Sequence, residues 1–295
     1  MRKFKFLGLL ALSMTAAVFT ACKDDDNSTA LPPIGGYSSA DEVAKADLVA
    51  YWSLNGDGKE AVSGANPSKS ANVTWVDGVK GKAAKFDVGY LAYDAMSNLG
   101  ENLETGFTIS CWVNVSNNST HPSTFFSLTR PNEWAGNINF VAETGWMPAT
   151  SDSITIKGLL VSEGELGWQD IRNTVKASAE DLAAGQVAYA NKIGGKWAHV
   201  VYTWDNTTKL AKVYANGVKI SNPAWENRDA TASKNFMMTA PTRPILGALE
   251  TYVTGTSSDA WNTGLEGMID EVRVWKRPLI LSDIGALYDL EKSGR

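Results

Sequence analysis

Residues 196–220, KWAHVVYTWDNTTKLAKVYANGVKI, carry the strongest hairpin signal in the chain. This stretch contains short runs rich in β-branched and aromatic residues, and polar turn residues separate these runs. Asn216 and Gly217 stand between AKVYA and VKI, and both residues tolerate the positive backbone φ that a two-residue hairpin turn requires. The stretch therefore predicts antiparallel strands joined by tight turns.

The same pattern of short runs divided by turns extends from Leu48 almost to the C-terminus. The other clear strand candidates are LVAYWSL (48–54), GKAAKFDV (81–88), FTISCWVNV (107–115), RPILGAL (243–249) and GMIDEVRVW (267–275). Helical signals are few: SAEDLAAG (178–185), with a Ser178 cap and Asp181 three residues on, and LSDIGALY (281–288). Many short strands with little helix predict an all-β, two-sheet antiparallel sandwich or barrel, in one domain over residues 46–295.

Composition limits the class of protein. The chain has 295 residues, of which 44% are hydrophobic and eleven are tryptophan, so it can build a sizeable core. The formal net charge of −5 gives no basic footprint for nucleic acid. Cys111 alternates with polar residues on the apolar side of FTISCWVNV, so we expect a buried small hydrophobe rather than a nucleophile.

Residues 1–21 have the layout of a secretory signal: basic residues at the start, an apolar run over 6–18, and small residues before Cys22. This run is too short for a membrane span. A cysteine directly after a small-residue cleavage site resembles the lipobox of bacterial lipoproteins, in which the thiol of the new N-terminal cysteine carries the lipid. Phe19 departs from the aliphatic residue of the strictest motif. The alternative is an ordinary secreted protein in which Cys22 is incidental.

Lys23 and the three aspartates at 24–26 resemble the short export signal of surface lipoproteins in certain Gram-negative bacteria. This resemblance implies an outer-membrane protein that is lipid-anchored and exposed at the cell surface. The alternative is a solvated charged tail that no receptor recognises. Residues 22–45 are polar and small and contain Pro-Pro and Gly-Gly pairs, so we expect a flexible acidic tether.

The order of the strand sequences resembles the laminin G-like, concanavalin A-like jelly-roll superfamily. The resemblance runs from about Leu48 to Asp289 and is weak over 116–194. Its most specific pieces are GKWAHV (195–200), YANG (214–217) and GMIDEVR (267–273). It implies a two-sheet antiparallel jelly-roll sandwich with few short helices. It implies less about function, because this fold hosts binding modules, glycosidases and adhesion modules alike.

Motifs for catalysis are absent from the sequence. Glucanases with this fold carry a strand of the form E-x-D-x-x-E, and this chain has no such string. Asp270 and Glu271 are adjacent, so they face opposite sides of a strand and cannot flank one glycosidic bond. Asp270 is either a structural carboxylate that accepts backbone hydrogen bonds or a calcium ligand, and no cofactor is otherwise required. His121 is expected in a solvated loop and His199 in a packing position.

The tryptophans divide into two groups. Five of them lie in predicted strands and are expected in the core: Trp52, Trp112, Trp197, Trp204 and Trp275. The six others lie near turns or in long connections: Trp75, Trp134, Trp146, Trp168, Trp225 and Trp261. The last five of these are the candidates for stacking on sugar rings. A single loop tryptophan is more often an anchor folded back on the domain. The segment 116–194 is longer than the superfamily core needs and holds three of the five.

Three functions follow as hypotheses. The first is non-catalytic binding of a glycan by a lipid-anchored surface protein, with a surface transporter or enzyme as a possible partner. The second is a protein-binding or adhesion module of the same fold. The third is a glycoside hydrolase or lyase with dispersed acids, for which the candidates are Glu133, Glu143, Glu163, Glu165 and Asp170. We favour a protein that is not an enzyme. A pair of carboxyl groups about 5 to 10 Å apart beside a tryptophan groove would indicate the hydrolase.

Overall fold

The structure is a computed structural model that describes residues 31–227, 229 and 231–295. The expected signal segment, the lipid-attachment residue Cys22 and the acidic run after it lie outside these described residues. Residues 33–295 form one compact unit. Within the described part of the chain, no helix has the length and apolar character needed to span a membrane.

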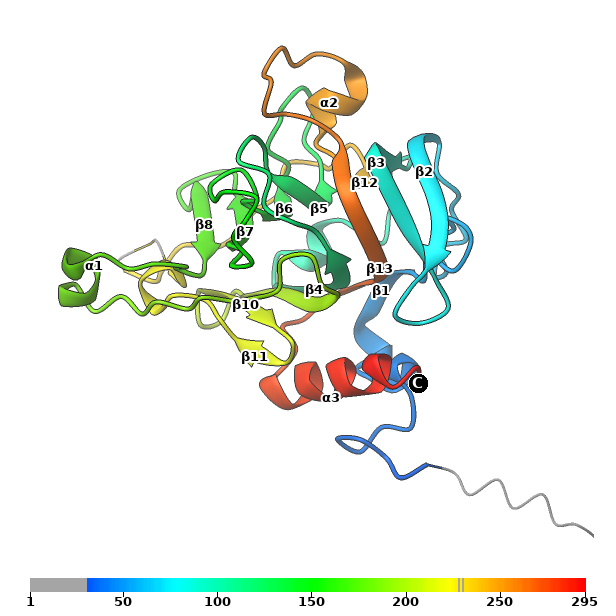
Figure 1. The fold of residues 1–295 in the computed structure, drawn as a ribbon, viewed down its shortest axis with the longest axis horizontal. Helices are drawn as coiled ribbons and strands as arrows, with labels where there is room; N and C mark the ends of the chain where they lie inside the picture. Colours follow the sequence, from blue (N-terminus) through cyan, green and yellow to red (C-terminus); the bar gives the residue numbers. More distant parts are fainter. Residues whose placement is uncertain (1–30, 228, 230) are drawn as a thin grey trace, which may run out of the picture. The chain divides into compact units, whose positions relative to one another are not determined.

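The unit is built almost entirely from antiparallel strands (Figure 1). The strands are β1 (Leu48–Trp52), β2 (Lys69–Asp77), β3 (Lys82–Ala92), β4 (Gly106–Asn114), β5 (Ser123–Leu128), β6 (Ile138–Ala142), β7 (Ile156–Val161), β8 (Trp168–Arg172), β9 (Ala198–Asp205), β10 (Leu210–Ala215), β11 (Val218–Lys219), β12 (Pro244–Leu246) and β13 (Leu265–Trp275). The helices are α1 (Ala179–Ala183), α2 (Glu250–Thr254) and α3 (Leu281–Lys292), with 3-10 turns η1 (Ala40–Glu42), η2 (Lys45–Asp47), η3 (Glu101–Leu103) and η4 (Pro223–Trp225).

The strands follow one curled path in the order β11-β10-β9-β4-β13-β3-β12-β5-β6-β7-β8, while β1 pairs with β13 and β2 pairs with β3. The short strand β12 links the two layers, because it pairs with β3 on one side and with β5 on the other. Beyond it, β7 and β8 fold back over β10. The expected all-β, two-layer antiparallel jelly roll is confirmed.

The hairpin that the sequence predicts at Asn216-Gly217 is present. Ala215 pairs with Val218, and the two turn residues have φ of 50° and 78°. The side chain of Asn216 also accepts a hydrogen bond from the backbone N–H of His199, at 3.0 Å. The turn therefore fixes β11 to the start of β9 as well as closing the hairpin.

Large aromatic side chains fill the space between the layers. Trp52, Trp204 and Phe140 are fully buried in the main core, and Cys111 is buried there too, as expected. Four of the five tryptophans expected in the core are buried, whereas Trp197 precedes β9 and is half-buried. Gly158 on β7 lies against the ring of Tyr202 on β9, so the two layers touch where β7 has no side chain.

The segment 116–194 differs from the expectation of long loops. It supplies the four consecutive strands β5 to β8, which form one whole edge of the sheet. These strands are five or six residues long, and β5 and β6 are buried on both faces, so they lack the alternation that reveals a half-exposed strand. The predicted helix in this segment is present as α1, with Ser178 and Asp181 bonded to each other in a capping box.

The expected flexible tether is wrong for residues 34–44. Ala40 and Val43 are buried against Ile284, Leu287 and Leu290 of α3. The indole N–H of Trp275 also donates to the carbonyl of Val43, at 3.1 Å. Apolar side chains spaced through this polar segment thus complete the core under α3.

Candidate functional site

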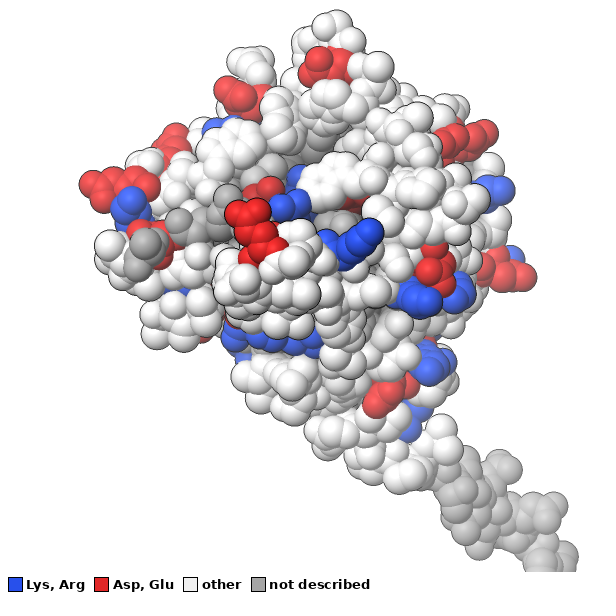
Figure 2. All heavy atoms as spheres, turned by 60° about the vertical axis from the view of Figure 1, so that its left-hand side comes forward, with Lys and Arg blue, Asp and Glu red and all other residues white. Residues whose placement is uncertain are grey.

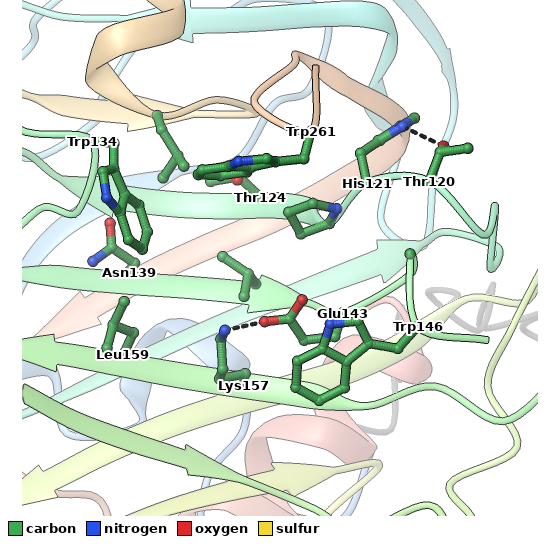
Figure 3. Close-up of a pocket in the computed structure, with 14 residues that line it drawn as sticks. Thr120, His121, Thr124, Trp134, Asn139, Glu143, Trp146, Lys157, Leu159 and Trp261 are labelled. Atoms are coloured by element: carbon green, nitrogen blue, oxygen red, sulfur yellow. Dashed lines mark hydrogen bonds and ion pairs between the residues drawn. The ribbon is translucent and has the colours of Figure 1, made fainter. Parts of the chain in front are cut away.

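A cleft of about 240 Å³ opens over β6 and β7, on the layer that the segment 116–194 builds (Figure 3). Its floor carries Asn139 and Leu159 from these two strands, with Glu143 and Lys157 beside them (Figure 3). The complete lining is Thr120, His121, Pro122, Thr124, Trp134, Asn139, Val141, Glu143, Gly145, Trp146, Lys157, Leu159, Leu249 and Trp261.

Tryptophans stand at both ends of this cleft. Trp134 and Trp261 form one wall, with ring centroids 5.4 Å apart and planes nearly perpendicular (Figure 3). Trp168 packs against the outer side of Trp134, at 5.5 Å. Trp146 stands at the opposite end and is 51% exposed. An apolar ring held partly in water is a suitable platform for the C–H face of a sugar.

Each wall tryptophan is fixed by the local chain. Trp134 lies in the turn between β5 and β6, and Trp261 lies in the connection from α2 to β13. Trp146 follows β6, where its backbone N–H bonds to the carbonyl of Glu143 at 3.1 Å. Gly145 permits this course, because a Cβ there would lie 2.8 Å from the backbone nitrogen of His121. The hydroxyl of Thr144 donates to the carbonyl of His121 at 2.8 Å and holds the two loops together.

Three polar side chains of the cleft floor have partners within the protein. Glu143 and Lys157 form an ion pair across the floor (Figure 3). Asn139 is held by Ser127 and by both backbone groups of Gly136. The cleft is therefore a formed site with little net charge.

His121 was expected to be solvated, and the structure instead places it half-buried at the rim of the cleft. Its Nδ1 lies 2.8 Å from the hydroxyl of Thr120, and its Nε2 lies 3.7 Å from a carboxylate oxygen of Glu266. The turn over 118–121 causes this placement, because Asn118 accepts hydrogen bonds from the backbone of Thr120 and His121.

A second pocket of about 310 Å³ shares Trp146 with the first cleft. Arg172, the last residue of β8, lies between two indoles: its guanidinium carbon is 5.0 Å from the ring centroid of Trp146 and 4.6 Å from that of Trp225. Asn222 positions Trp225, because its N–H bonds to the carbonyl of Arg172 at 2.9 Å and its side chain caps η4. Figure 2 shows this side of the molecule, with a hollowed surface and small scattered groups of both charges.

All five tryptophans that the sequence selects as sugar platforms thus meet on one side of the domain. Trp134, Trp146 and Trp261 line the first cleft, and Trp225 lines the second with Trp146. Trp168 is the first residue of β8 rather than part of a loop. The polar members Arg172, Lys157 and Asn139 were missed, because nothing in a single sequence marks which polar strand residues face a cleft.

The dispersed acids proposed for a hydrolase do not converge. Among the described residues, Glu143 is the only carboxylate that lines the first cleft, and it is bound to Lys157. Glu133 lies 3.9 Å from Arg130, and Glu163 accepts from the hydroxyl of Thr239 at 2.8 Å. Neither Glu165 nor Asp170 lines either pocket.

Asp270 has the structural role that the sequence suggested. Its carboxylate accepts hydrogen bonds from the backbone of Val79, Lys80 and Glu271, at 2.8, 3.2 and 2.9 Å. Burial raises the pKa of this carboxyl group to about 7. Within the described residues, no group of three or more His, Cys, Asp or Glu side chains converges on a metal position.

Comparison with known proteins places the chain in a family. A sequence profile of the concanavalin A-like lectin/glucanases superfamily matches residues 89–285, well over half of the chain. The chain belongs to this concanavalin A-like superfamily. The resemblance seen in its strand sequences is thereby confirmed. No curated protein matches the sequence.

Solved structures share the concanavalin A-like fold at low sequence identity. Domain 4 of an extracellular arabinanase from Geobacillus stearothermophilus, solved with arabinotriose, has a TM-score of 0.52 at 20% identity, over 82% of this chain and 98% of that domain. The binding domain of botulinum neurotoxin DC, solved with a sialylated ligand, has a TM-score of 0.53 at 13% identity. The match covers 84% of this chain and 52% of that one. Trypanosoma rangeli sialidase has a TM-score of 0.51 at 16% identity, and the match covers 83% of this chain and 33% of the sialidase. The chain thus spans the whole arabinanase domain but about half of the toxin domain and a third of the sialidase.

Proposed function

We propose that this protein binds glycans without cleaving them, as a lipid-anchored domain at the cell surface. The observation that carries the proposal is the cleft between Trp134, Trp146 and Trp261. Sugar rings stack on partly exposed indoles, and hydroxyl groups bond to fixed polar side chains such as Asn139 and Glu143. The structures of similar fold that were solved in complex with sugars support this choice of ligand.

The distribution of carboxylates supports binding over hydrolysis. A glycosidase requires two carboxyl groups on either side of the scissile bond. Only one carboxyl group, that of Glu143, lines the cleft among the described residues, and it is bound in an ion pair with Lys157. The proposal includes no metal or cofactor in the binding step.

The membrane anchor is proposed from the sequence alone. Cys22 would carry the lipid, and Lys23 with the aspartates at 24–26 would direct the protein to the outer face of the outer membrane. A surface transporter or enzyme is then a natural partner. Labelled fatty acid should enter the native protein and not the Cys22→Ser variant, and equal labelling of both would refute the anchor.

The binding proposal is tested with residues 23–295 on a glycan array, with and without calcium, while cleavage products are measured in the same samples. We expect binding without cleavage. The Trp134→Ala/Trp146→Ala/Trp261→Ala variant should lose binding while keeping its circular dichroism spectrum. Trp75→Ala is the matched control, because Trp75 lies half-buried on β2 and lines neither pocket. Cleavage would indicate an enzyme, and binding of no glycan would favour the adhesion module.

A further inference from the structure

The second pocket contains a cation held in an unusual way. The guanidinium of Arg172 lies over two indole rings, those of Trp146 and Trp225. Such stacking stabilises the cation and restricts its rotation. The N–H donors of a guanidinium lie in its plane, so stacking leaves them directed outward at the edge.

Arg172 has no acidic partner at hydrogen-bonding distance. Among the described residues, no Asp or Glu oxygen lies within 4.0 Å of its guanidinium nitrogens. The exposed Lys176 lines the same pocket. Asp181 also lines it, but both carboxylate contacts of Asp181 go to Ser178, the cap of α1. Two cations against one engaged carboxylate leave a net positive pocket.

The first cleft differs in this respect. Its cation, Lys157, is neutralised by Glu143 on the cleft floor. Trp146 forms the end of this cleft and one wall of the positive pocket. A ligand that stacks on Trp146 therefore meets a neutral surface on one side and a cationic edge on the other.

Resting on the proposed glycan-binding function, we propose that the second pocket is a subsite for an acidic sugar, whose carboxylate pairs with Arg172. The ligand is then an acidic oligosaccharide that places a neutral face on Trp134 and Trp261 and its carboxylate against the edge of the Arg172 guanidinium. A planar guanidinium edge matches a planar carboxylate in a bidentate pair. The pocket volumes of about 240 and 310 Å³ suit short pieces of one chain rather than two large ligands.

The test uses matched pairs of oligosaccharides as probes: oligogalacturonate, a hyaluronan tetrasaccharide and sialyllactose, each beside its carboxyl methyl ester. Sulfated lactose is the probe for a general anion site. We expect wild-type protein to bind at least one acid about tenfold more tightly than its ester. Added salt should weaken binding of the acid and leave binding of the ester unchanged.

Substitution of Arg172 identifies the group responsible. Arg172→Gln should remove the preference for the acid and leave binding of the ester unchanged, and Arg172→Lys should restore part of the preference. Lys59→Gln is the charge control, because Lys59 is exposed and lines neither pocket.

Three outcomes would overturn the inference: equal binding of acids and esters, equal loss of both in Arg172→Gln, or binding of sulfated lactose in preference to every carboxylate. If neutral glycans bind and acids gain nothing, the proposed function stands and only the acidic subsite is refuted. If wild-type protein binds no probe of either kind, the subsite and the glycan-binding function fail together.

Discussion

At the scale of single residues, Trp146 borders both pockets, and Arg172 lies beside it in the second pocket. A tryptophan among polar turn residues is conspicuous in a sequence, because an indole there must either anchor a loop or face a ligand. Arg172 carries no such signal, since charged residues occur at the end of many strands. Its position between two indoles arises only when β8 and η4 come together.

Trp146 lines both pockets, so its substitution should have the widest effect on binding. We expect Trp146→Ala to reduce affinity for neutral and acidic glycans about tenfold or more. Trp225→Ala should reduce affinity for acidic glycans alone, because Trp225 lines only the second pocket. Titration calorimetry measures both, and a Trp146→Ala variant with wild-type affinities would contradict the assignment.

His199 should make the protein sensitive to acid. Burial, and then the charge of Arg273, lower the pKa of His199 to about 3. The unfolded chain takes up this proton near pH 6.5. His199 therefore contributes stability fully above pH 6.5, and this contribution disappears as the pH falls towards about 3.

The free energy of unfolding of the wild type should thus fall more steeply from pH 6.5 to 4 than that of His199→Gln, in urea titrations. The raised pKa of Asp270 acts in the opposite direction between about pH 4 and 7, and it cancels in the comparison because both proteins retain Asp270. His121→Gln replaces the half-buried histidine at the rim of the cleft and is the control. Parallel pH profiles for wild type and His199→Gln would show that His199 is not held neutral.

At the scale of elements, α3 is fastened to the sheet by buried charge as well as by apolar contacts. Arg273 of β13 pairs with Glu291 of α3 and, at 2.8 Å, with Glu271. The indole N–H of Trp112 donates to Glu291 at 2.7 Å. The sequence predicted both the strand and the helix, but the pairing of residues 273 and 291 depends on how α3 crosses the sheet.

Substitution of one partner of this buried pair should lower the free energy of unfolding more than substitution of both partners. Arg273→Leu should reduce the free energy of unfolding by about 3–5 kcal/mol, because it leaves buried carboxylates without a cation. Arg273→Leu/Glu291→Leu should recover part of that loss. Urea unfolding of the single and double variants measures the difference, and strictly additive losses would argue against a coupled pair.

The contact between β7 and β9 gives a second test at this scale. A methyl group on Gly158 would lie 2.3 Å from the ring of Tyr202, so Gly158→Ala should lower the free energy of unfolding by about 1–3 kcal/mol. Gly285→Ala is the matched control in α3, where nothing lies within 4 Å of an added Cβ. The free energy of unfolding of this control should rise by about 0.5–1 kcal/mol, since alanine is more stable than glycine inside a helix. Thermal unfolding compares the two, and equal effects would refute the close contact at β7.

At the scale of the whole molecule, the sequence predicted the fold class and most strands of the layer that carries the hairpin. It did not predict the layer that carries the cleft, because strands buried on both faces look like short apolar runs without period. It also placed the start of the domain at residue 46, although the contacts of Ala40 and Val43 with α3 begin earlier. Isolated apolar residues such as Ala40 and Val43 in a polar segment do not reveal, from the sequence alone, that they pack against a distant helix.

Deletion tests the earlier start of the domain. A protein that begins at residue 46 should melt about 5–10 °C below one that begins at residue 33, since the loss of a few buried side chains costs about 2–4 kcal/mol. The core under α3 would be uncovered in the shorter protein. Differential scanning calorimetry of the two proteins gives the comparison, and identical melting temperatures would show that residues 34–45 contribute nothing to the fold.

The contacts of residues 34–47 also determine how the domain responds to force. A pull through the chain before Pro33 loads first a few side-chain contacts, such as the hydrogen bond from Tyr37 to Asp283 and the ion pair of Asp41 with Arg273. The backbone ladder between β1 and β13 is loaded only after these contacts break. Because an extended chain covers about 3.3 Å per residue, release of about fourteen residues adds roughly 45 Å of slack. We therefore expect this segment to detach and lengthen under tension before the strands of the sandwich separate.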